Sequence, residues 1–338
     1  MNHLTPELPK ATMRVVVSEQ LGSLDDYHLA VVTVPQPGPK QVRIRITAAA
    51  LGYADGLLAQ GRYQVKPPVP FIPGCEFSGV IDAVGKDVTG WLPGQRVAAH
   101  SLGGALAEYA IANSHDLNAT PDAVTDESSA AFWVDFATAY HALRDRAQLK
   151  IGETVLVLGA AGSLGQAAIQ VARALGATVI AAASTQDKRD AALLSGASKA
   201  IDYTAPDWTE QLKTLTQGKG VNVVFDPVGG STFEPAFRRL AWGGRHLVLG
   251  FTGGPIPSLP INLALIKGAS LVGVEIRQFA NVFEPAKAQQ NRVKLAALMR
   301  AGTLKPGIGP RYELLQFGEA LKTCSDRQRI GKTIININ

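Results

Sequence analysis

The sequence predicts an α/β protein in which a doubly wound parallel sheet accompanies a β-rich domain. Its 338 residues exceed what one compact core usually organises, so two domains are expected. The first 120 or so residues contain short β-like runs separated by Pro-Gly and Gly-Lys-Asp turns. From Gly152 onward, predicted strands alternate with predicted helices, which is typical of a parallel sheet with helices on both faces.

Composition excludes several classes of protein. Apolar residues make up 46% of the chain and charged residues 18%, as in ordinary globular proteins. The net charge is +5, and the Lys and Arg residues are scattered along the chain, so no nucleic-acid partner is expected. A mildly positive charge suits an enzyme that takes up a phosphorylated cofactor. Cys75 and Cys324, the two cysteines, exclude a disulfide framework and a cysteine-built zinc site. No long apolar run indicates a membrane span, and MNHLTPELPKATM, which lacks a signal core, is expected to be a mobile tail of a cytoplasmic protein.

The β-rich part is predicted from period-2 patterns. In QVRIRITAAA, Val42, Ile44 and Ile46 alternate with polar residues, as in a half-buried strand. MRVVVSE, the stretch around FSGVIDAVG, QRVAAHS and GALAEYAIAN continue this pattern. ESSAAFWVDFATAYHAL, preceded by a Thr-Asp cap signal, then predicts a helix.

The second part predicts the parallel sheet. Its expected strands are Thr154–Leu158, Thr178–Ala183, Ala200–Asp202, Val221–Asp226, Gly244–Leu249 and Ser270–Val274. Expected helices include Gly165–Leu175, Lys188–Ser195 and Pro285–Arg300, and GKTIININ predicts a closing strand.

The turn between the first of these strands and its helix resembles a dinucleotide fingerprint. Ala160, Gly162 and Gly165 occupy its three small-residue positions, with Ser163 and Leu164 at the start of the helix. Gly162 lets the backbone approach a pyrophosphate, and Gly165 lets the helix pack on the strand. Amides at a helix start attract anions, so the loop predicts nucleotide binding. The alternative is a tight turn that holds no ligand.

The end of the next strand favours NADP(H) over NAD. An NAD site places an acid there for the ribose 2′-hydroxyl. The chain instead offers Ser184 and Thr185, followed by Lys188 and Arg189. A hydroxyl and cations accept a 2′-phosphate that an acid would repel. In the alternative interpretation Lys188 and Arg189 are only solvent-exposed charges at the start of a helix.

Together these stretches resemble the zinc-independent quinone oxidoreductase branch of the medium-chain dehydrogenase/reductase superfamily. The resemblance rests on ADGLLAQGRYQVKPPVPFIPGCEFSGVIDAVG, ATAYHAL, GETVLVLGAAGSLGQAAIQVARALGATVIAAAS, SGASKAIDY, FDPVGG, GGRHLVLGF and GKTII. It implies a Rossmann domain at 134–275 inserted in a GroES-like catalytic domain at 1–133 plus 276–338, with NADPH in the cleft between them. It also implies a homodimer formed through edge strands of the Rossmann sheets, around Ser270–Val274.

Zinc-dependent relatives in this superfamily use an early Cys, a His in a Gly-His-Glu segment, and a later Cys or Asp. Here LGYADG has no Cys, and Gly74-Cys75-Glu76 replaces Gly-His-Glu. One soft ligand and one acid do not make a three-ligand site, so no metal is expected. A metal-free hydride transfer suits an acceptor that is already activated, namely a quinone or an alkene conjugated to a carbonyl.

The resemblance supplies candidate residues for the reaction. Tyr63 matches the tyrosine that related enoyl reductases use as proton donor, and a phenol is protonated at neutral pH. Tyr53 is the second candidate and a substrate contact. It follows Gly52, which stands where the family has Asn, so roles at this point are open. Asp55 matches a family acid and is expected to be structural.

The resemblance also supplies cofactor contacts. It places Thr138 near the nicotinamide ribose or the phosphates, and Val228 and Gly229 near that ribose. It places Gly250 and Phe251 near the carboxamide, and Tyr203 beside the adenosine phosphate. Lys332 matches the closing motif, and Arg277 is a candidate contact to substrate or cofactor phosphate. His100, His141 and His246 receive no role.

The sequence therefore predicts an NADPH-dependent, metal-free reductase of quinones or α,β-unsaturated carbonyl compounds. An alternative is a reductase of enoyl thioesters on CoA or a carrier protein, which Arg62 and Lys66 would suit. A third hypothesis is a nucleotide-binding protein with little catalysis.

Overall fold

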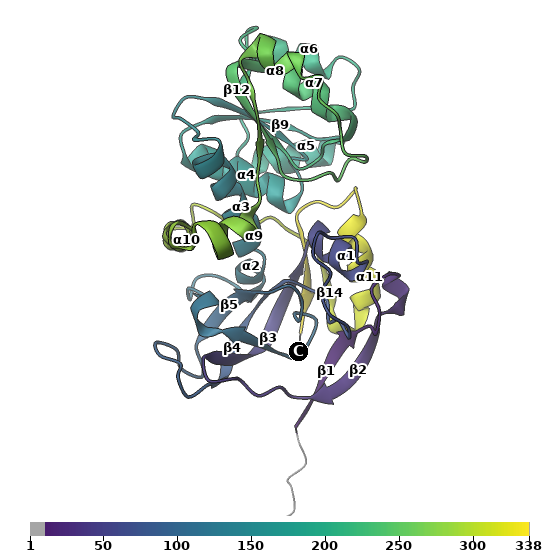
Figure 1. Ribbon diagram of the computed structural model, residues 1–338, viewed down its shortest axis with the longest axis vertical. Coiled ribbons are helices and arrows are strands. Elements are labelled where there is room, and N and C mark those ends of the chain that lie inside the picture. The colour runs from purple at the N-terminus through teal and green to yellow at the C-terminus, as the bar shows by residue number, and fades with distance from the viewer. Residues whose placement is uncertain (1–10, 338) are drawn as a thin grey trace, which may run out of the picture. The chain divides into compact units, whose positions relative to one another are not determined.

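The computed structural model describes residues 11–337, which form two compact units (Figure 1). The β-rich unit contains residues up to 131, 311–326 and 333 onward. The Rossmann unit contains residues 132–310 and 327–332. The expected tail falls mostly in residues 1–10, which lie outside the described residues.

A mainly antiparallel sheet organises the β-rich unit. Its strand order is β14-β15-β3-β4-β5-β7, with β6 also paired to β3. The strands are β3 (Gln41–Leu51), β4 (Glu76–Val84), β5 (Arg96–His100), β6 (Tyr109–Asn113), β7 (Asn118–Ala119), β14 (Ile308–Glu313) and β15 (Lys332–Asn336). β1 (Thr12–Val17) and β2 (His28–Thr33) form a separate antiparallel pair. The helices and helical turns are η1 (Leu24–Asp26), α1 (Tyr53–Ala59), η2 (Ser114–Asp116), α2 (Asp126–Ala130), η6 (Leu314–Gln316), α11 (Phe317–Lys322) and η7 (Thr323–Ser325).

The alternation along β3 is confirmed, because Val42, Ile44 and Ile46 are all buried in the core of this unit. The closing strand is also confirmed: β15 pairs antiparallel with β3, bringing the C-terminal residues back to the N-terminal sheet (Figure 1). A buried, alternating strand fixes its own register, since a slip by one residue would expose the apolar face.

Six parallel strands form the sheet of the Rossmann unit, in the order β10-β9-β8-β11-β12-β13. They are β8 (Thr154–Leu158), β9 (Thr178–Ala182), β10 (Lys199–Ile201), β11 (Val221–Asp226), β12 (Leu240–Val248) and β13 (Ser270–Gly273). The helices and helical turns are α3 (Trp133–Tyr140), η3 (His141–Arg146), α4 (Ser163–Ala174), α5 (Gln186–Leu194), α6 (Trp208–Leu215), η4 (Gly230–Thr232), α7 (Phe233–Arg238), α8 (Asn262–Lys267), α9 (Ile276–Gln278), η5 (Phe279–Phe283) and α10 (Pro285–Arg300). When the strands are numbered along the chain from β8 as 1, their order across the sheet is 3-2-1-4-5-6. Successive strands are therefore added toward one edge up to β10 and toward the other edge from β11 on, and the change occurs between β8 and β11. The α/β fold, with one Rossmann unit and one GroES-like unit, is as predicted.

The helix expected over 127–143 is divided. α2 packs with the β-rich unit, where Asp126 accepts a hydrogen bond from Thr47 Oγ1 (2.8 Å) and pairs with Arg96 (2.6 Å). α3 begins after two intervening residues and belongs to the Rossmann unit. The two segments break apart because their apolar faces bury against different cores.

Residues 276–310 belong to the Rossmann unit, whereas the boundary drawn from the resemblance placed them with the β-rich domain. Leu295 and Met299 of α10 are buried. Asn291 of α10 donates to Asp145 Oδ2 (2.7 Å), Lys287 lies 3.7 Å from Asp145 Oδ1, and His141 Nδ1 lies 3.1 Å from Oδ2. These contacts hold α10 against α3 and η3.

We expect Asp145 to contribute acid-sensitive stability. Burial raises its pKa, but hydrogen bonds from His141 and Asn291 and the charge of Lys287 lower the pKa below its ordinary value overall. A carboxyl whose pKa is lower in the folded state stabilises the fold above its unfolded pKa and loses that contribution as pH falls through the folded pKa. Asp145→Asn should therefore lower the free energy of unfolding by about 1–3 kcal/mol at neutral pH, with a smaller difference near pH 3.

Urea unfolding of both proteins across this pH range measures the difference. The exposed Asp122 provides the matched control, Asp122→Asn, which should change neither value. An equal loss of stability by Asp145→Asn at both pH values would contradict this account of Asp145.

Candidate active site

The loop between β8 and α4 is built to bring backbone close to a ligand. Gly159 supplies the left-handed turn (φ 59°), and a Cβ there would lie 3.0 Å from Val228. Ala160 is buried, and its amide donates to the Ala182 carbonyl (3.2 Å). The sharp turn that the first glycine of a dinucleotide fingerprint usually makes is made here by Gly159, one residue earlier, which explains why alanine is tolerated at 160.

The two later glycines have different reasons to be glycine. A Cβ on Gly165 would lie 2.3 Å from the Gly159 carbonyl oxygen and 2.8 Å from Ala160 Cα, so α4 could not pack as it does. A Cβ on Gly162 would meet only the Gly159 oxygen, at 3.5 Å, and its φ of −67° suits any residue. Packing within the protein therefore requires Gly165 but not Gly162. The open space beside Gly162, with the amides of Ser163 and Leu164 at the start of a 12-residue helix, fits a pyrophosphate.

The closing segment of the chain lies against this loop. The Gly331 amide donates to the Ala161 carbonyl (3.0 Å), and Gly331 bridges in parallel to Gly162. Lys332 is buried, and its Nζ lies 3.2 Å from Asp135 Oδ2 in α3. The lysine therefore anchors the segment to α3. Thr138, one turn further along α3, is half-buried, and its hydroxyl donates to the Val134 carbonyl (2.7 Å).

Beyond β9 the structure brings three of the predicted residues together. Lys188 is only 8% exposed, and its Nζ donates to Ser184 Oγ (3.3 Å) and to the Arg327 carbonyl. The Tyr203 hydroxyl hydrogen-bonds to Ser184. Burial raises the pKa of Tyr203, while the nearby Arg327 charge acts in the opposite direction. Ser184 therefore lies between the Lys188 ammonium and a phenol that stays protonated, and the Arg327 charge acts on that phenol.

Arg189, the other predicted cation in this region, is paired. Arg189 lies 2.9 Å from Asp202 Oδ2 and is therefore a weaker candidate than the sequence indicates. Asp187 is exposed in the first turn of α5. Arg327 is a candidate that the sequence reasoning missed. Its only signal in the sequence is the basic run DRQR just before the closing Gly-Lys motif.

The loops after β11 and β12 contain the remaining predicted cofactor residues. The Val228 carbonyl accepts from the Gly253 amide (2.8 Å), and a Cβ on Gly229 (φ 61°) would lie 3.0 Å from the Phe251 ring. Gly250 lies at this same contact, 3.4 Å from that Cβ position. Val228 also lies beside Gly159. The three loops thus converge at the carboxyl edge of the sheet, where the strand order reverses and open α/β sheets bind their ligands.

Tyr53, Tyr63 and Asp55 lie in the β-rich unit. Tyr53 begins α1 and is 36% exposed, whereas Tyr63 is half-buried against the core of that unit. Asp55 is buried and accepts from the amides of Gly52 (2.6 Å) and Cys75 (2.7 Å). Asp55 therefore holds the start of α1 against the turn before β4. α1 itself was not predicted, because it is short and depends on this tertiary contact.

Arg277 belongs to α9 in the Rossmann unit, where it pairs weakly with Glu275 (3.8 Å). Its Nε is buried without a hydrogen-bond acceptor among residues 11–337. Within the same residues, no three His, Cys, Asp or Glu side chains gather in a way that could hold a metal ion. No helix in this range is long and apolar enough to span a membrane.

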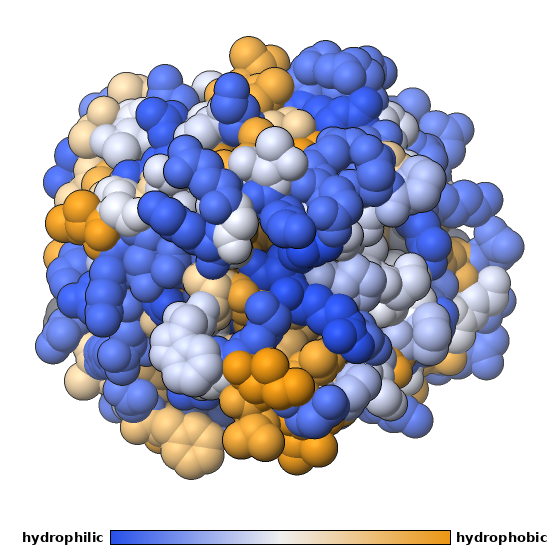
Figure 2. Space-filling model, turned by 90° about the horizontal axis from the view of Figure 1, so that it is seen from above, coloured by the Kyte–Doolittle hydropathy of each residue, from blue (hydrophilic) through white to orange (hydrophobic). Residues whose placement is uncertain are grey.

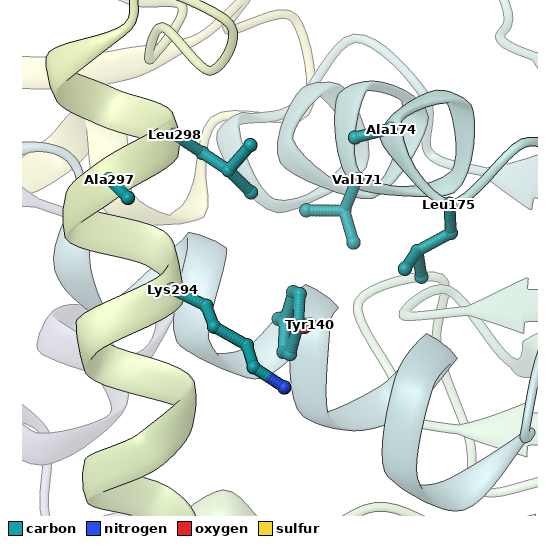
Figure 3. A pocket seen from close by; sticks show the side chains of 7 residues that line it. All are labelled: Tyr140, Val171, Ala174, Leu175, Lys294, Ala297 and Leu298. Carbon is teal, nitrogen blue, oxygen red and sulfur yellow. The ribbon is translucent and has the colours of Figure 1, made fainter.

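A cavity of about 320 Å³ lies elsewhere on the Rossmann unit. Figure 3 shows its lining residues, which come from α3, the C-terminal half of α4, and α10: Tyr140, Val171, Ala174, Leu175, Lys294, Ala297 and Leu298. The glycine loop is at the opposite end of α4, roughly 18 Å away for a helix of this length. The cavity is therefore distinct from the candidate cofactor site.

Comparison with known proteins agrees with this geometry. Residues 38–122 match the alcohol dehydrogenase GroES-like domain, and residues 163–289 match the zinc-binding dehydrogenase family. The rat quinone oxidoreductase-like protein 2 is 36% identical over 305 residues, covering 90% of this chain and 87% of that protein. The chain belongs to the quinone oxidoreductase branch of the medium-chain dehydrogenase/reductase superfamily.

Other members of this family extend the likeness. Human quinone oxidoreductase is 32% identical over 292 residues, 86% of each chain. The quinone oxidoreductase of Thermus thermophilus, whose structures include a complex with NADPH, aligns with a TM-score of 0.81 at 32% identity, covering 96% of this chain and 99% of that one. This family assignment makes the protein an oxidoreductase with a nucleotide-binding fold.

Proposed function

We propose that this oxidoreductase is an NADPH-dependent, metal-free reductase of quinones or α,β-unsaturated carbonyl compounds. The observation that carries the proposal is the group around Ser184, in which Lys188, Tyr203 and Arg327 offer positive charge and hydroxyls. No carboxylate stands at residues 183–186, directly after β9. This group suits the 2′-phosphate of NADPH. The relatives named as quinone oxidoreductases support the choice of acceptor.

In this proposal NADPH supplies the hydride, and residues of the chain orient it. The amides at the start of α4 and the space beside Gly162 bind the pyrophosphate. Ser184 and its neighbours bind the 2′-phosphate, and the loops containing Val228, Gly250 and Phe251 orient the nicotinamide end. Tyr63 donates to the acceptor's carbonyl oxygen, where negative charge develops as the hydride adds. Tyr53 and Arg277 contact the substrate.

The metal-free part of the proposal rests on the ligand positions of zinc-dependent relatives. LGYADG lacks their early Cys, and Gly74-Cys75-Glu76 stands where they have Gly-His-Glu, so one thiol and one acid remain, which is too few for a three-ligand zinc site. Without a metal to polarise an alcohol, the reverse oxidation of simple alcohols is disfavoured.

The acceptor class is tested by NADPH oxidation with a quinone, cyclohexenone, an alkenal and an enoyl-CoA. We expect turnover with the quinone or the enones. Turnover with the enoyl thioester alone would favour the thioester reductase instead. NADPH binding without turnover of any acceptor would favour a binding protein with little catalysis.

Tyr63→Phe tests the proposed donor. Loss of one donor to a developing oxyanion typically costs about a hundredfold in kcat. We expect this loss with cyclohexenone and a much smaller loss with a quinone, whose oxygens accept protons from water after reduction. Tyr312→Phe, at a tyrosine that packs against the same core and has no proposed role, is the matched control, with less than about threefold loss of kcat. Equal turnover of the enone by Tyr63→Phe and the unmodified protein would remove Tyr63 from this role.

We also propose that the protein is a homodimer formed through β13. Among the described strands, β13 pairs only with β12, which leaves an open edge. Exposed apolar side chains lie on or near α8 and this edge: Trp242, Ile261, Leu265, Ile266 and Leu271. Trp242, 81% exposed, packs beside Gly268 at the end of α8. Figure 2, which views the molecule from the end where α6 and α8 lie, shows hydrophobic side chains gathered in patches.

A second copy of the chain would cover both the edge and these side chains. Light scattering after size-exclusion chromatography should give twice the mass of one chain at micromolar concentration. The double variant Leu265→Glu with Leu271→Lys should give the mass of a single chain. A monomer in the unmodified protein would contradict the proposal.

A further inference from the structure

A histidine and an aspartate are buried side by side at the carboxyl edge of the Rossmann sheet. Asp226 is the last residue of β11, and His246 lies in the neighbouring strand β12. His246 Nε2 lies 2.9 Å from Asp226 Oδ2, and the two residues are 0% and 2% exposed. Burying these polar groups is costly unless every one is hydrogen-bonded, so the arrangement of their remaining partners is informative.

The second oxygen of the Asp226 carboxylate holds the start of the following loop. Oδ1 accepts from the amides of Val228 (2.8 Å) and Gly229 (2.7 Å). The main-chain carbonyl of Asp226 accepts from the Leu249 amide (3.0 Å), at the start of the loop after β12. Asp226 therefore fixes the first turn of the loop after β11 and the point where the chain leaves β12.

The two loops are also joined to each other. The Gly253 amide donates to the Val228 carbonyl (2.8 Å), and the Thr252 amide donates to the Pro227 carbonyl (3.3 Å). Gly229 adopts a left-handed conformation and has no room for a Cβ beside Phe251. Hydrogen bonds thus tie the two loops together, and the Asp226 carboxylate lies where they begin.

His246 has one polar partner among the described residues, and that partner is Asp226. Its ring lies against Phe233 and Phe237, with centroids 4.5 Å and 5.9 Å away, and its Nδ1 has no hydrogen-bond partner in residues 11–337. A carboxylate only accepts, so Nε2 is the donor. The polar contribution of His246 is therefore to orient the carboxylate of Asp226.

We propose that Asp226 and His246 are positioning residues for the nicotinamide end of the cofactor. They hold Val228 and Gly229 in register with Gly250 and Phe251, and this register sets where the nicotinamide ring lies relative to an acceptor. The inference rests on the proposed function, in which these loops contact the nicotinamide. The adenosine end has its own contacts at Ser184 and the glycine loop, so misplaced loops should reduce hydride transfer more than they reduce cofactor affinity.

Two variants of similar shape isolate the hydrogen bond. His246→Gln retains an N–H donor about where Nε2 lies, whereas His246→Met has nearly the same length and no donor. We expect His246→Gln to keep kcat within about threefold and His246→Met to lose roughly tenfold or more, with the Kd for NADPH changed less than about threefold in both. Leu295→Ala, a buried change in α10 remote from these loops, controls for general destabilisation and should lower Tm without lowering kcat at 25 °C.

A second readout does not depend on activity. Hydrogen exchange of peptides spanning Asp226–Thr232 should be faster in His246→Met than in the unmodified protein or His246→Gln, with and without NADPH. If the unmodified protein reduces no acceptor, the proposed function fails, yet this exchange pattern still tests the positioning. The inference would be overturned if His246→Gln and His246→Met had the same exchange rate and the same kcat as each other. This holds whether both variants keep the kcat of the unmodified protein or both lose it.

Discussion

NADPH should bind at least about a hundredfold more tightly than NADH. Two charge-assisted hydrogen bonds to the 2′-phosphate contribute about 1.5–3 kcal/mol each, and each 1.4 kcal/mol is tenfold in affinity. Ser184 with Lys188 and the exposed Arg327 beside Tyr203 are the groups expected to make them. Fluorescence titration with the two cofactors measures the ratio, and equal affinities would contradict the assignment.

Variants locate the origin of this preference. Arg327→Gln should weaken NADPH binding about tenfold and leave NADH binding unchanged, since the 2′-phosphate is the only difference between the cofactors. Ser184→Asp should weaken NADPH binding further by adding a negative charge. Arg300→Gln, an exposed arginine at the end of α10, is the matched control and should change neither affinity. If Arg327→Gln weakened both cofactors equally, Arg327 would not be a 2′-phosphate contact.

Replacing Gly165 or Gly162, at the start of α4, by alanine should affect stability differently. Gly165→Ala places a Cβ within 2.3 Å of a backbone oxygen and 2.8 Å of a Cα, neither of which is free to move. Forced overpacking of this kind costs about 1–3 kcal/mol, so Tm should fall by several degrees. Cofactor binding should weaken as a consequence of the displaced helix.

Gly162→Ala should spare the fold and weaken the cofactor. Its Cβ has only an ordinary contact at 3.5 Å, and replacing glycine by alanine at a helix N-cap costs less than about 1 kcal/mol. If the pyrophosphate lies against this residue, NADPH affinity should fall at least about tenfold. Differential scanning calorimetry and titration of both variants separate the two effects. Unchanged NADPH affinity in Gly162→Ala would mean that the ligand does not approach this position.

Local patterns in the sequence were sufficient to predict most of the Rossmann unit. β8 and β11 begin and end where their apolar runs do, because strands buried on both faces need continuous apolar sequence. The glycine fingerprint and the lack of an acid directly after β9 are equally local, so the sequence alone was enough to propose Ser184 as a cofactor contact and Gly165 as a packing position. The prediction of a single helix over 127–143 was wrong, because the segment divides into α2 and α3. Helical spacing alone does not reveal which core an apolar face packs against.

The residues that sequence reasoning missed depend on contacts over long separations. Arg327 approaches Tyr203 from more than a hundred residues away, and Lys188 reaches the Arg327 carbonyl over a separation of 139 residues. His246 received no role because its partner, Asp226, becomes its neighbour only when β11 and β12 pair. Spacing within a single sequence carries no signal for such pairs.

The central claim, a metal-free reduction by NADPH, is tested by one measurement on chelator-treated protein. Zinc content is determined by elemental analysis, and NADPH oxidation with a quinone is followed before and after chelation. We predict zinc well below one per chain and undiminished turnover with NADPH. One zinc per chain with loss of turnover on its removal, or no NADPH oxidation at all, would contradict the account.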